Sequence, residues 1–291
     1  MFAQLFSILA PVFIAAAIGY AWVRFDRPFD VDTATRLVVA VGVPCLVFQS
    51  LTGAGADRAA LVDVAGAAVL VMAVTAALGV AFLKAWGQPV RAFLPSIFLA
   101  NNGNMGLPLT LFAFGQEGMA LGMAFMVASA VVGLPALASL SSGVSSLGAL
   151  ARLPMVYAVL LALAFLALDW PVPGWTTNTL DLLAGFTVPL MLITLGASLA
   201  KMGATGMGRG VVLAALRLSL GFAVGWGVAE ALGFEGVARG VVILQSSMPV
   251  AVIDHLYAQR YGTEPRAVAG AVLASTLASL VTLPILIWFV L

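Results

Sequence analysis

Apolar residues fill most of the chain in runs of about 20, and short polar segments separate these runs. A run of this length can cross the hydrocarbon core of a bilayer as a helix. The predicted spans are residues 4–22, 33–52, 60–83, 92–114, 117–140, 153–170, 178–199, 208–232, 237–258 and 266–291. The pattern therefore predicts an all-α polytopic membrane protein with ten transmembrane helices and no separate soluble domain.

The fourth run carries polar and helix-breaking residues where a regular membrane helix would be apolar. These residues are Asn101, Asn102, Asn104, Gly106 and Pro108. An unsatisfied backbone group costs several kcal/mol in hydrocarbon, so broken backbone persists there only where it is buried in protein or lines a cavity. We therefore expect an unwound crossover near the middle of the membrane, and we expect it to bind the substrate.

Prolines recur in the same order in the two halves of the chain, at a nearly constant separation. Four in the first half match four in the second: Pro11, Pro44, Pro108 and Pro135 with Pro154, Pro189, Pro249 and Pro284. Each half has five predicted spans, an odd number, so the second half would be inserted upside down. The sequence thus predicts two inverted five-helix repeats, 1–140 and 153–291, joined by a cytoplasmic Ser- and Gly-rich linker, 141–152.

The repeat pairs the interrupted span 92–114 with the span 237–258, which Pro249 breaks after Gln245 and Ser246. Where two broken helices cross, their exposed N-terminal ends favour an anion, particularly a carboxylate. The predicted substrate-binding residues are Asn101, Asn102, Asn104, Gly106, Pro108, Gln245, Ser246 and Pro249. Alternatively, the asparagines only cap broken helix ends, and the serine bonds its own backbone.

Three of the ionisable residues within predicted spans are candidates for ion coupling or for support of the site. Asp254 could carry a proton, ligate sodium or pair with a cation, or it could be solvated near the cytoplasmic end. Arg217 could clamp a carboxylate, pair with Asp254 or reach the interface, and we favour a structural role. His255 titrates near physiological pH, which suits a proton relay, although a lone histidine near the interface is often incidental.

Composition narrows the functional class. The chain is 63% hydrophobic and 9% charged, whereas a soluble domain carries about 25% charged residues. A net charge of +1 without a basic patch excludes nucleic-acid binding. The single Cys45 and single His255 exclude a disulfide scaffold and most metal sites, and we expect no cofactor. An intramembrane protease would need paired aspartates or a serine–histidine pair, so we expect no enzyme.

Basic residues are distributed unevenly between the two sets of predicted loops. Ten lie in loops on one side or at the span ends beside them: Arg24, Arg27, Arg36, Lys84, Arg91, Arg152, Lys201, Arg209, Arg260 and Arg266. The other side has only Arg58 and Arg239, and Arg217 lies within a span. Because cytoplasmic loops carry the excess of Lys and Arg, both termini are predicted to face the periplasm.

The crossover motif resembles that of a known family. Asn101 followed by Gly106-Leu107-Pro108 resembles the crossover of the auxin efflux carrier family, which includes plant carriers and bacterial transporters linked to organic acids. Residues 249–262 resemble that family's second crossover and the helix end after it. The resemblance covers essentially the whole chain, and of the three asparagines only Asn101 matches the family position.

The resemblance implies a bacterial inner-membrane carrier of a small organic anion, either auxin-like or malate- or malonate-like. It also implies a scaffold (4–52 and 153–199), often dimeric, and a transport domain (60–140 and 208–291) that moves like an elevator. The coupling ion would be a proton or sodium, with the sodium site unlocated. The alternative is a sodium/proton antiporter or a sodium-coupled bile-acid-type symporter, but these usually need more intramembrane acids than Asp254 alone.

Overall fold

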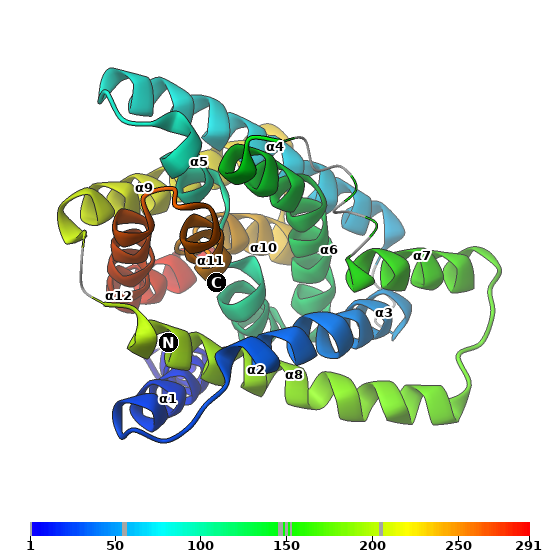
Figure 1. Cartoon of the computed structure of the whole chain (residues 1–291). Coiled ribbons are helices and arrows are strands. Elements are labelled where there is room, and N and C mark those ends of the chain that lie inside the picture. Colours follow the sequence, from blue (N-terminus) through cyan, green and yellow to red (C-terminus); the bar gives the residue numbers. More distant parts are fainter. Residues whose placement is uncertain (1, 54–56, 145–147, 149–150, 152, 204–205) are drawn as a thin grey trace.

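The computed structural model of the chain describes residues 2–53, 57–144, 148, 151, 153–203 and 206–291. Regular structure in this part is helical apart from one isolated bridge, so the predicted all-α fold is confirmed (Figure 1). The first half contains α1 (Phe2–Arg24), α2 (Val31–Leu37), η1 (Val38–Gly42), α3 (Val43–Gly53), α4 (Arg58–Ala85), α5 (Val90–Phe98), η2 (Asn102–Gly106) and α6 (Leu107–Ser142). The second half contains α7 (Pro154–Ala167), α8 (Gly174–Lys201), α9 (Met207–Ala231), α10 (Gly236–Ser246), α11 (Val252–Tyr261) and α12 (Pro265–Val290).

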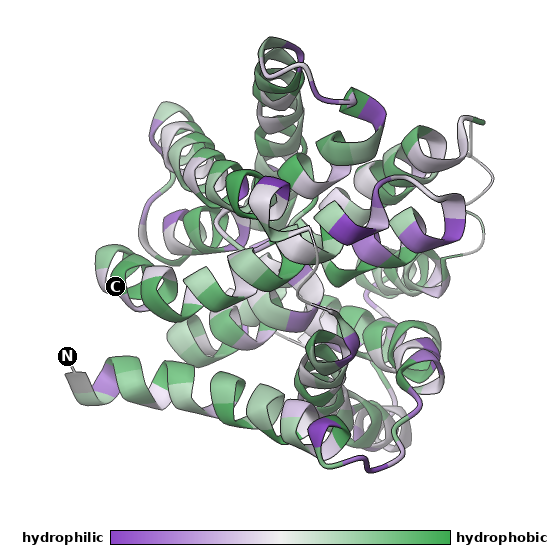
Figure 2. Cartoon of the chain, turned by 60° about the vertical axis from the view of Figure 1, so that its left-hand side comes forward, coloured by the Kyte–Doolittle hydropathy of each residue, from purple (hydrophilic) through white to green (hydrophobic). Residues whose placement is uncertain are grey.

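Seven helical stretches of the described residues are long and apolar enough to cross a membrane. They are Ala3–Arg24, Val31–Gly53, Arg58–Ala85, Asn102–Ser142, Gly174–Lys201, Met207–Ala231 and Pro265–Val290. Apolar residues also cover much of the outside of the helices (Figure 2). The protein is therefore a multi-pass membrane protein. The count of ten spans stays a prediction, because α5, α7, α10 and α11 are shorter than a full span.

Both predicted interruptions of apolar runs are present. The first run divides into α5 and the start of α6, with Leu99 to Asn101 outside the α-helices and the short π-helix η2 after them. The run 237–258 divides into α10 and α11 around Pro249. In addition, α6 changes direction at Gly115, where φ is 67° and ψ is −152°, a conformation that only glycine adopts readily.

Packing separates the helices into two groups. The first group is α1, α2, η1, α3, α7 and α8, in which α1 lies along α8 and α3 lies between α7 and α8. The second group is α4, α5, α6 and α9 to α12, in which α9 packs on α12 and α4 packs on α6. Contacts between the groups are fewer and involve chiefly α6, η2 and α12 of the second group. Half of the predicted linker, 141–152, falls on residues outside the described part of the chain, and α6 extends into its start, to Ser142.

A methionine-rich apolar cluster fills much of the boundary between the two groups. Its buried members include Met119, Met123 and Met126 on α6, Met155 on α7 and Met191 on α8. Methionine side chains are flexible and unbranched, so they fill irregular gaps and adapt when neighbouring helices shift. This cluster will be called the methionine interface.

Candidate functional site

The two interrupted segments meet and pair with each other. Ala100 and Val250 form an antiparallel bridge. The N–H of Asn101 donates to the carbonyl oxygen of Pro249 at 2.8 Å, and the N–H of Ala251 donates to that of Leu99 at 3.3 Å. These bonds satisfy backbone groups that the broken helices leave free, which is the condition for irregular backbone at membrane depth.

Arg217 on α9 holds the C-terminal ends of the two half-helices that enter the crossing. Its guanidinium donates to the carbonyl oxygens of Ile97 at 2.8 Å, Met248 at 3.1 Å and Ser246. Its side chain is fully enclosed, with 2% of the residue exposed. A cation is favoured at helix C-termini, and it replaces the missing N–H donors there. Arg217 thus supports the crossing and does not face a cavity.

A cavity of about 200 Å³ lies at the N-terminal ends of the half-helices that leave the crossing. Asn101, Asn102, Gly103 and Asn104 line it from the start of η2, and residues 251–253 line it from the start of α11. Apolar walls come from Val39, Met126, Leu134 and Leu256, among others. This space will be called the crossover cavity. Because both helix N-termini point their free N–H groups and positive dipole ends toward it, it suits an anion.

Several polar atoms around the crossover cavity are buried without a hydrogen-bond partner among the described residues. They are Nδ2 of Asn101, Oδ1 of Asn102 and Oγ1 of Thr194. Asn101 and Asn102 are 4% and 5% exposed. A buried polar atom without a partner costs about 1–3 kcal/mol, so three at one cavity indicate a place where a ligand or water completes the bonding.

Other predicted site residues lie under the crossing and do not line the crossover cavity. Gln245 is fully buried, its amide nitrogen lies 3.4 Å from the carbonyl oxygen of Gly122, and its Oε1 has no partner among the described residues. A Cβ at Gly106 would overlap the Gln245 amide, so glycine leaves room for this close approach. Ser246 donates to its own helix at Val242, and Pro108 lies in the first turn of α6.

Asp254 and His255 lie in the first turn of α11, on the side away from the crossover cavity. Asp254 is 2% exposed, and both carboxylate oxygens lack a partner among the described residues. No ion pair in the described part of the chain joins it to Arg217. His255 is 8% exposed, and its Nδ1 likewise has no partner there. The direct Arg217–Asp254 pair considered from the sequence is therefore not formed.

Sequence reasoning missed the contribution of α8 and α6 to the crossover cavity. Thr194 and Ser198 on α8, Ser129 on α6 and Thr35 on α2 all line it. Thr194, Ser198 and Ser129 each lie within an apolar run, where a hydroxyl residue most often bonds its own helix backbone. Thr35 lies in a polar stretch beside Arg36. The sequence gives no signal that separates Thr194, whose hydroxyl is free, from Ser198, whose hydroxyl donates to the Thr194 carbonyl at 2.7 Å.

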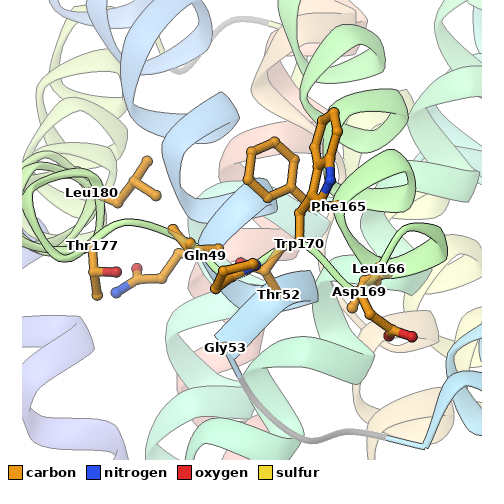
Figure 3. Close-up of a pocket in the computed structure, with 11 residues that line it drawn as sticks. Gln49, Thr52, Gly53, Phe165, Leu166, Asp169, Trp170, Thr177 and Leu180 are labelled. Carbon is orange, nitrogen blue, oxygen red and sulfur yellow. The ribbon is translucent and has the colours of Figure 1, made fainter.

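Two larger cavities lie on the other side of the methionine interface. One, of about 410 Å³, is bounded by α3, α7 and the start of α8, and Figure 3 shows Gln49, Thr177 and Trp170 around it. The other, of about 580 Å³, shares Gln49 and Thr177 with the first and reaches Gln116 and Met119 of α6. The two cavities therefore adjoin each other: the first lies within the first helix group, and the second reaches the boundary between the groups.

The fold and the crossing define the class: a polytopic membrane protein with two broken helices that meet at a small polar cavity. The family model described as "Membrane transport protein" matches residues 5–144 and 138–287, so the chain belongs to this family, as the resemblance predicted. A protein of Methanothermobacter thermautotrophicus named as an uncharacterized transporter is 29% identical over 274 residues, which cover 88% of each chain. A second such transporter, from Methanocaldococcus jannaschii, is 25% identical over 226 residues, covering 74% of this chain and 73% of that one.

Proposed function

We propose that this membrane transport protein is a secondary active carrier of a small organic anion, with a mono- or dicarboxylate as the substrate. The observation that carries the proposal is the crossover cavity, where two helix N-termini and the unpartnered amides of Asn101 and Asn102 converge. The helix ends supply positive potential, and the amides supply directed hydrogen bonds. Asn104, which also lines the cavity, is a further substrate contact.

The roles of the remaining predicted residues follow from their positions. Gly106 and Gln245 set the close packing of the two broken segments, and Pro249 supplies the carbonyl that pairs with Asn101. Arg217 fixes the C-terminal ends, so that the N-terminal ends stay aimed at the substrate. All four residues therefore affect substrate binding indirectly, by fixing the geometry of the crossing.

Ten spans arranged as two inverted five-helix repeats are part of the proposal. In this arrangement α5 with the start of α6 forms the fourth span, and α10 with α11 forms the ninth. The antiparallel pairing of Ala100 with Val250 supports it, because an inverted repeat brings equivalent segments together head to tail. The distribution of basic residues supports an orientation with both termini in the periplasm, and a bacterial inner membrane is the proposed location.

An elevator-like movement accounts for the two helix groups. The group with α1, α3, α7 and α8 corresponds to the scaffold, which would also form a homodimer, and the group with the crossing corresponds to the transport domain. Packing is dense within each group and sparse between them, and the methionine interface lies along the boundary. On the proposed orientation, the crossover cavity lies toward the cytoplasm, whereas the cavity in Figure 3 and the one adjoining it lie toward the periplasm.

Asp254 is the proposed site of ion coupling. Among the described residues it is the only buried acid, and its carboxylate has no partner. An ionised carboxylate in such a place needs a positive charge, which a bound proton or sodium ion would supply. His255 is its neighbour in sequence and a secondary candidate. A single acid favours a coupled organic-anion carrier over a sodium/proton antiporter or a bile-acid-type symporter.

Uptake of radiolabelled carboxylates into proteoliposomes tests the proposal. The wild-type protein should accumulate at least one small carboxylate when a proton or sodium gradient is imposed. Asn101→Ala should reduce uptake at least tenfold, because the unmade bond from its Nδ2 to a charged group costs about 1.5–3 kcal/mol. Asn102→Ala should reduce uptake less, because Oδ1 of Asn102 can accept only from a neutral donor on the substrate. Asn178→Ala, at an exposed asparagine of α8, is the control and should transport normally. Normal uptake by both crossover variants would contradict the proposed site.

A further inference from the structure

The crossover cavity is shared between the two helix groups, and the hydroxyl of Thr194 is the contribution of α8. Thr194 is 5% exposed, lines the cavity and has an unpartnered Oγ1. Its own carbonyl accepts the hydroxyl of Ser198 one turn later. The Thr194 hydroxyl is thus the one on this face of α8 that stays free for a ligand, although it lies far in sequence from both crossovers.

The position of Thr194 is fixed by tight packing of α8 on α1. A Cβ at Gly196 would overlap the carbonyl oxygen of Ala16, and a Cβ at Gly19 would overlap that of Ile193. The two backbones therefore approach too closely for a side chain at either glycine, on both sides of Thr194 in the sequence. A hydroxyl held on such a rigid helix pair is positioned before the ligand binds, which favours selective hydrogen bonding.

A carboxylate alone cannot form hydrogen bonds with all three unpartnered atoms at the crossover cavity. Nδ2 of Asn101 is a donor, Oδ1 of Asn102 is an acceptor, and a threonine hydroxyl is both. A carboxylate only accepts hydrogen bonds, so it cannot satisfy Oδ1 of Asn102. A ligand that completes all three therefore carries a donor group in addition to its carboxylate.

Charge and size limit the ligand further. The residues lining the cavity include no Lys, Arg or His. Two helix N-termini supply the equivalent of roughly half a positive charge each, which together balance about one negative charge. The cavity volume of about 200 Å³ lies below the roughly 300–1,000 Å³ typical of sites for drug-sized ligands. One carboxylate on a short carbon chain fits both limits.

We propose that the crossover cavity selects small monocarboxylates that carry a hydroxyl group beside the carboxylate, and that Thr194 and Asn102 bind this hydroxyl. The inference rests on the proposed function and deepens it. The carboxylate binds at the N-termini of η2 and α11, where Nδ2 of Asn101 donates to it. The substrate hydroxyl donates to Oδ1 of Asn102 and accepts from Oγ1 of Thr194, so the ligand bridges the two helix groups.

Equilibrium binding to the purified full-length protein tests this inference with three acids as probes. Lactate carries the hydroxyl, propionate lacks it, and malate adds a second carboxylate. Lactate should bind at least tenfold more tightly than propionate, because the analogue leaves buried polar atoms unpaired. Lactate should also bind more tightly than malate. Equal affinity for lactate and propionate, or tighter binding of malate, would overturn the inference.

Variants at α8 separate selection of the hydroxyl from a general structural effect. Thr194→Val keeps the shape and should lower lactate affinity about tenfold while leaving propionate affinity unchanged within about twofold. Thr194→Ser should restore lactate binding. Ser198→Ala is the matched control, since that hydroxyl is used by its own helix, and should bind both acids normally. An unchanged ratio of lactate to propionate affinity in Thr194→Val would refute the role of Thr194.

The same experiment distinguishes failure of this inference from failure of the proposed function. If wild-type protein binds these acids and Asn101→Ala does not, but Thr194→Val retains the wild-type ratio, the carboxylate site stands and the hydroxyl selection is wrong. If Asn101→Ala binds the acids as tightly as the wild type, the crossover cavity is not the site. In that case both proposals fail.

Discussion

Replacing Arg217 with methionine tests whether one buried cation holds the crossing together. The substitution removes three charge-assisted hydrogen bonds, to Ile97, Ser246 and Met248, and leaves these carbonyl oxygens buried without donors. Each such bond contributes about 1.5–3 kcal/mol. Methionine recovers part of the packing and removes the cost of burying a charge, which offsets some of this loss. We expect a net destabilisation of about 3–5 kcal/mol.

The assay is thermal unfolding of the detergent-solubilised protein, followed by the emission of its six tryptophans. A loss of this size should lower Tm by about 5–8 °C in a chain of this length. Arg217→Lys should give an intermediate decrease, since one ammonium nitrogen reaches fewer of the three carbonyls than a guanidinium does.

Arg209→Met is the matched control on the same helix. Arg209 pairs with Glu264 at 2.8 Å, but both side chains are partly exposed, at 44% and 38%. A pair of this kind contributes about 0–1 kcal/mol, so Tm should change by no more than about 2 °C. If Arg217→Met melts within about 2 °C of the wild type, the carbonyl contacts do not stabilise the crossing and the reasoning is refuted.

Three further substitutions probe the crossing, the coupling and the boundary between the helix groups. Gly106→Ala should destabilise the protein by about 1–3 kcal/mol, since its Cβ meets the Gln245 amide. Denaturation of Gly106→Ala, Gln245→Ala and the double variant should show that the shorter side chain at position 245 relieves this destabilisation. Purely additive losses of stability would contradict the contact between residues 106 and 245. Asp254→Asn should abolish the dependence of transport on the imposed proton or sodium gradient while retaining substrate binding; uptake that still follows the gradient would remove Asp254 from coupling. Met191→Trp should block movement across the methionine interface, so that proteoliposome uptake falls at least tenfold with binding preserved, and normal uptake would argue against movement at this boundary.

The interruptions in the helices could be predicted from the sequence because their cause is local. Three asparagines, two glycines and a proline within eight residues cannot continue a membrane helix, and Pro249 has the same effect in the later run. The all-α fold follows from apolar runs long enough to span a bilayer. Both features depend on composition within a short window, which the sequence displays directly.

The register of the crossing could not be predicted in the same way. The proline pattern matched Pro108 with Pro249, whereas in the structure Ala100 pairs with Val250, and Pro108 lies beyond η2 in the first turn of α6. Register at the crossing is set by backbone hydrogen bonds between segments far apart in sequence. The positions of single prolines carry no information about these bonds. The roles of Arg217 and Thr194 were hidden for the same reason.

Arg217 illustrates the difference between residue type and residue role. From the sequence it could clamp a substrate, pair with Asp254 or reach the interface, and each alternative suits an arginine in a membrane helix. The structure instead turns its guanidinium toward three carbonyls from both halves of the chain. Only the packing of α9 against the two half-helices determines which partner is within reach.

The central claim is that a small carboxylate binds at the N-terminal ends of the crossed half-helices. The most direct measurement is a crystal structure of the complex with a bromine-substituted short-chain carboxylate, located by the anomalous scattering of bromine. The claim predicts a bromine peak inside the crossover cavity, with the carboxylate against Asn101 and the start of α11. A single ordered peak in the cavities between α3, α7 and α8, with the crossover cavity empty, would contradict it.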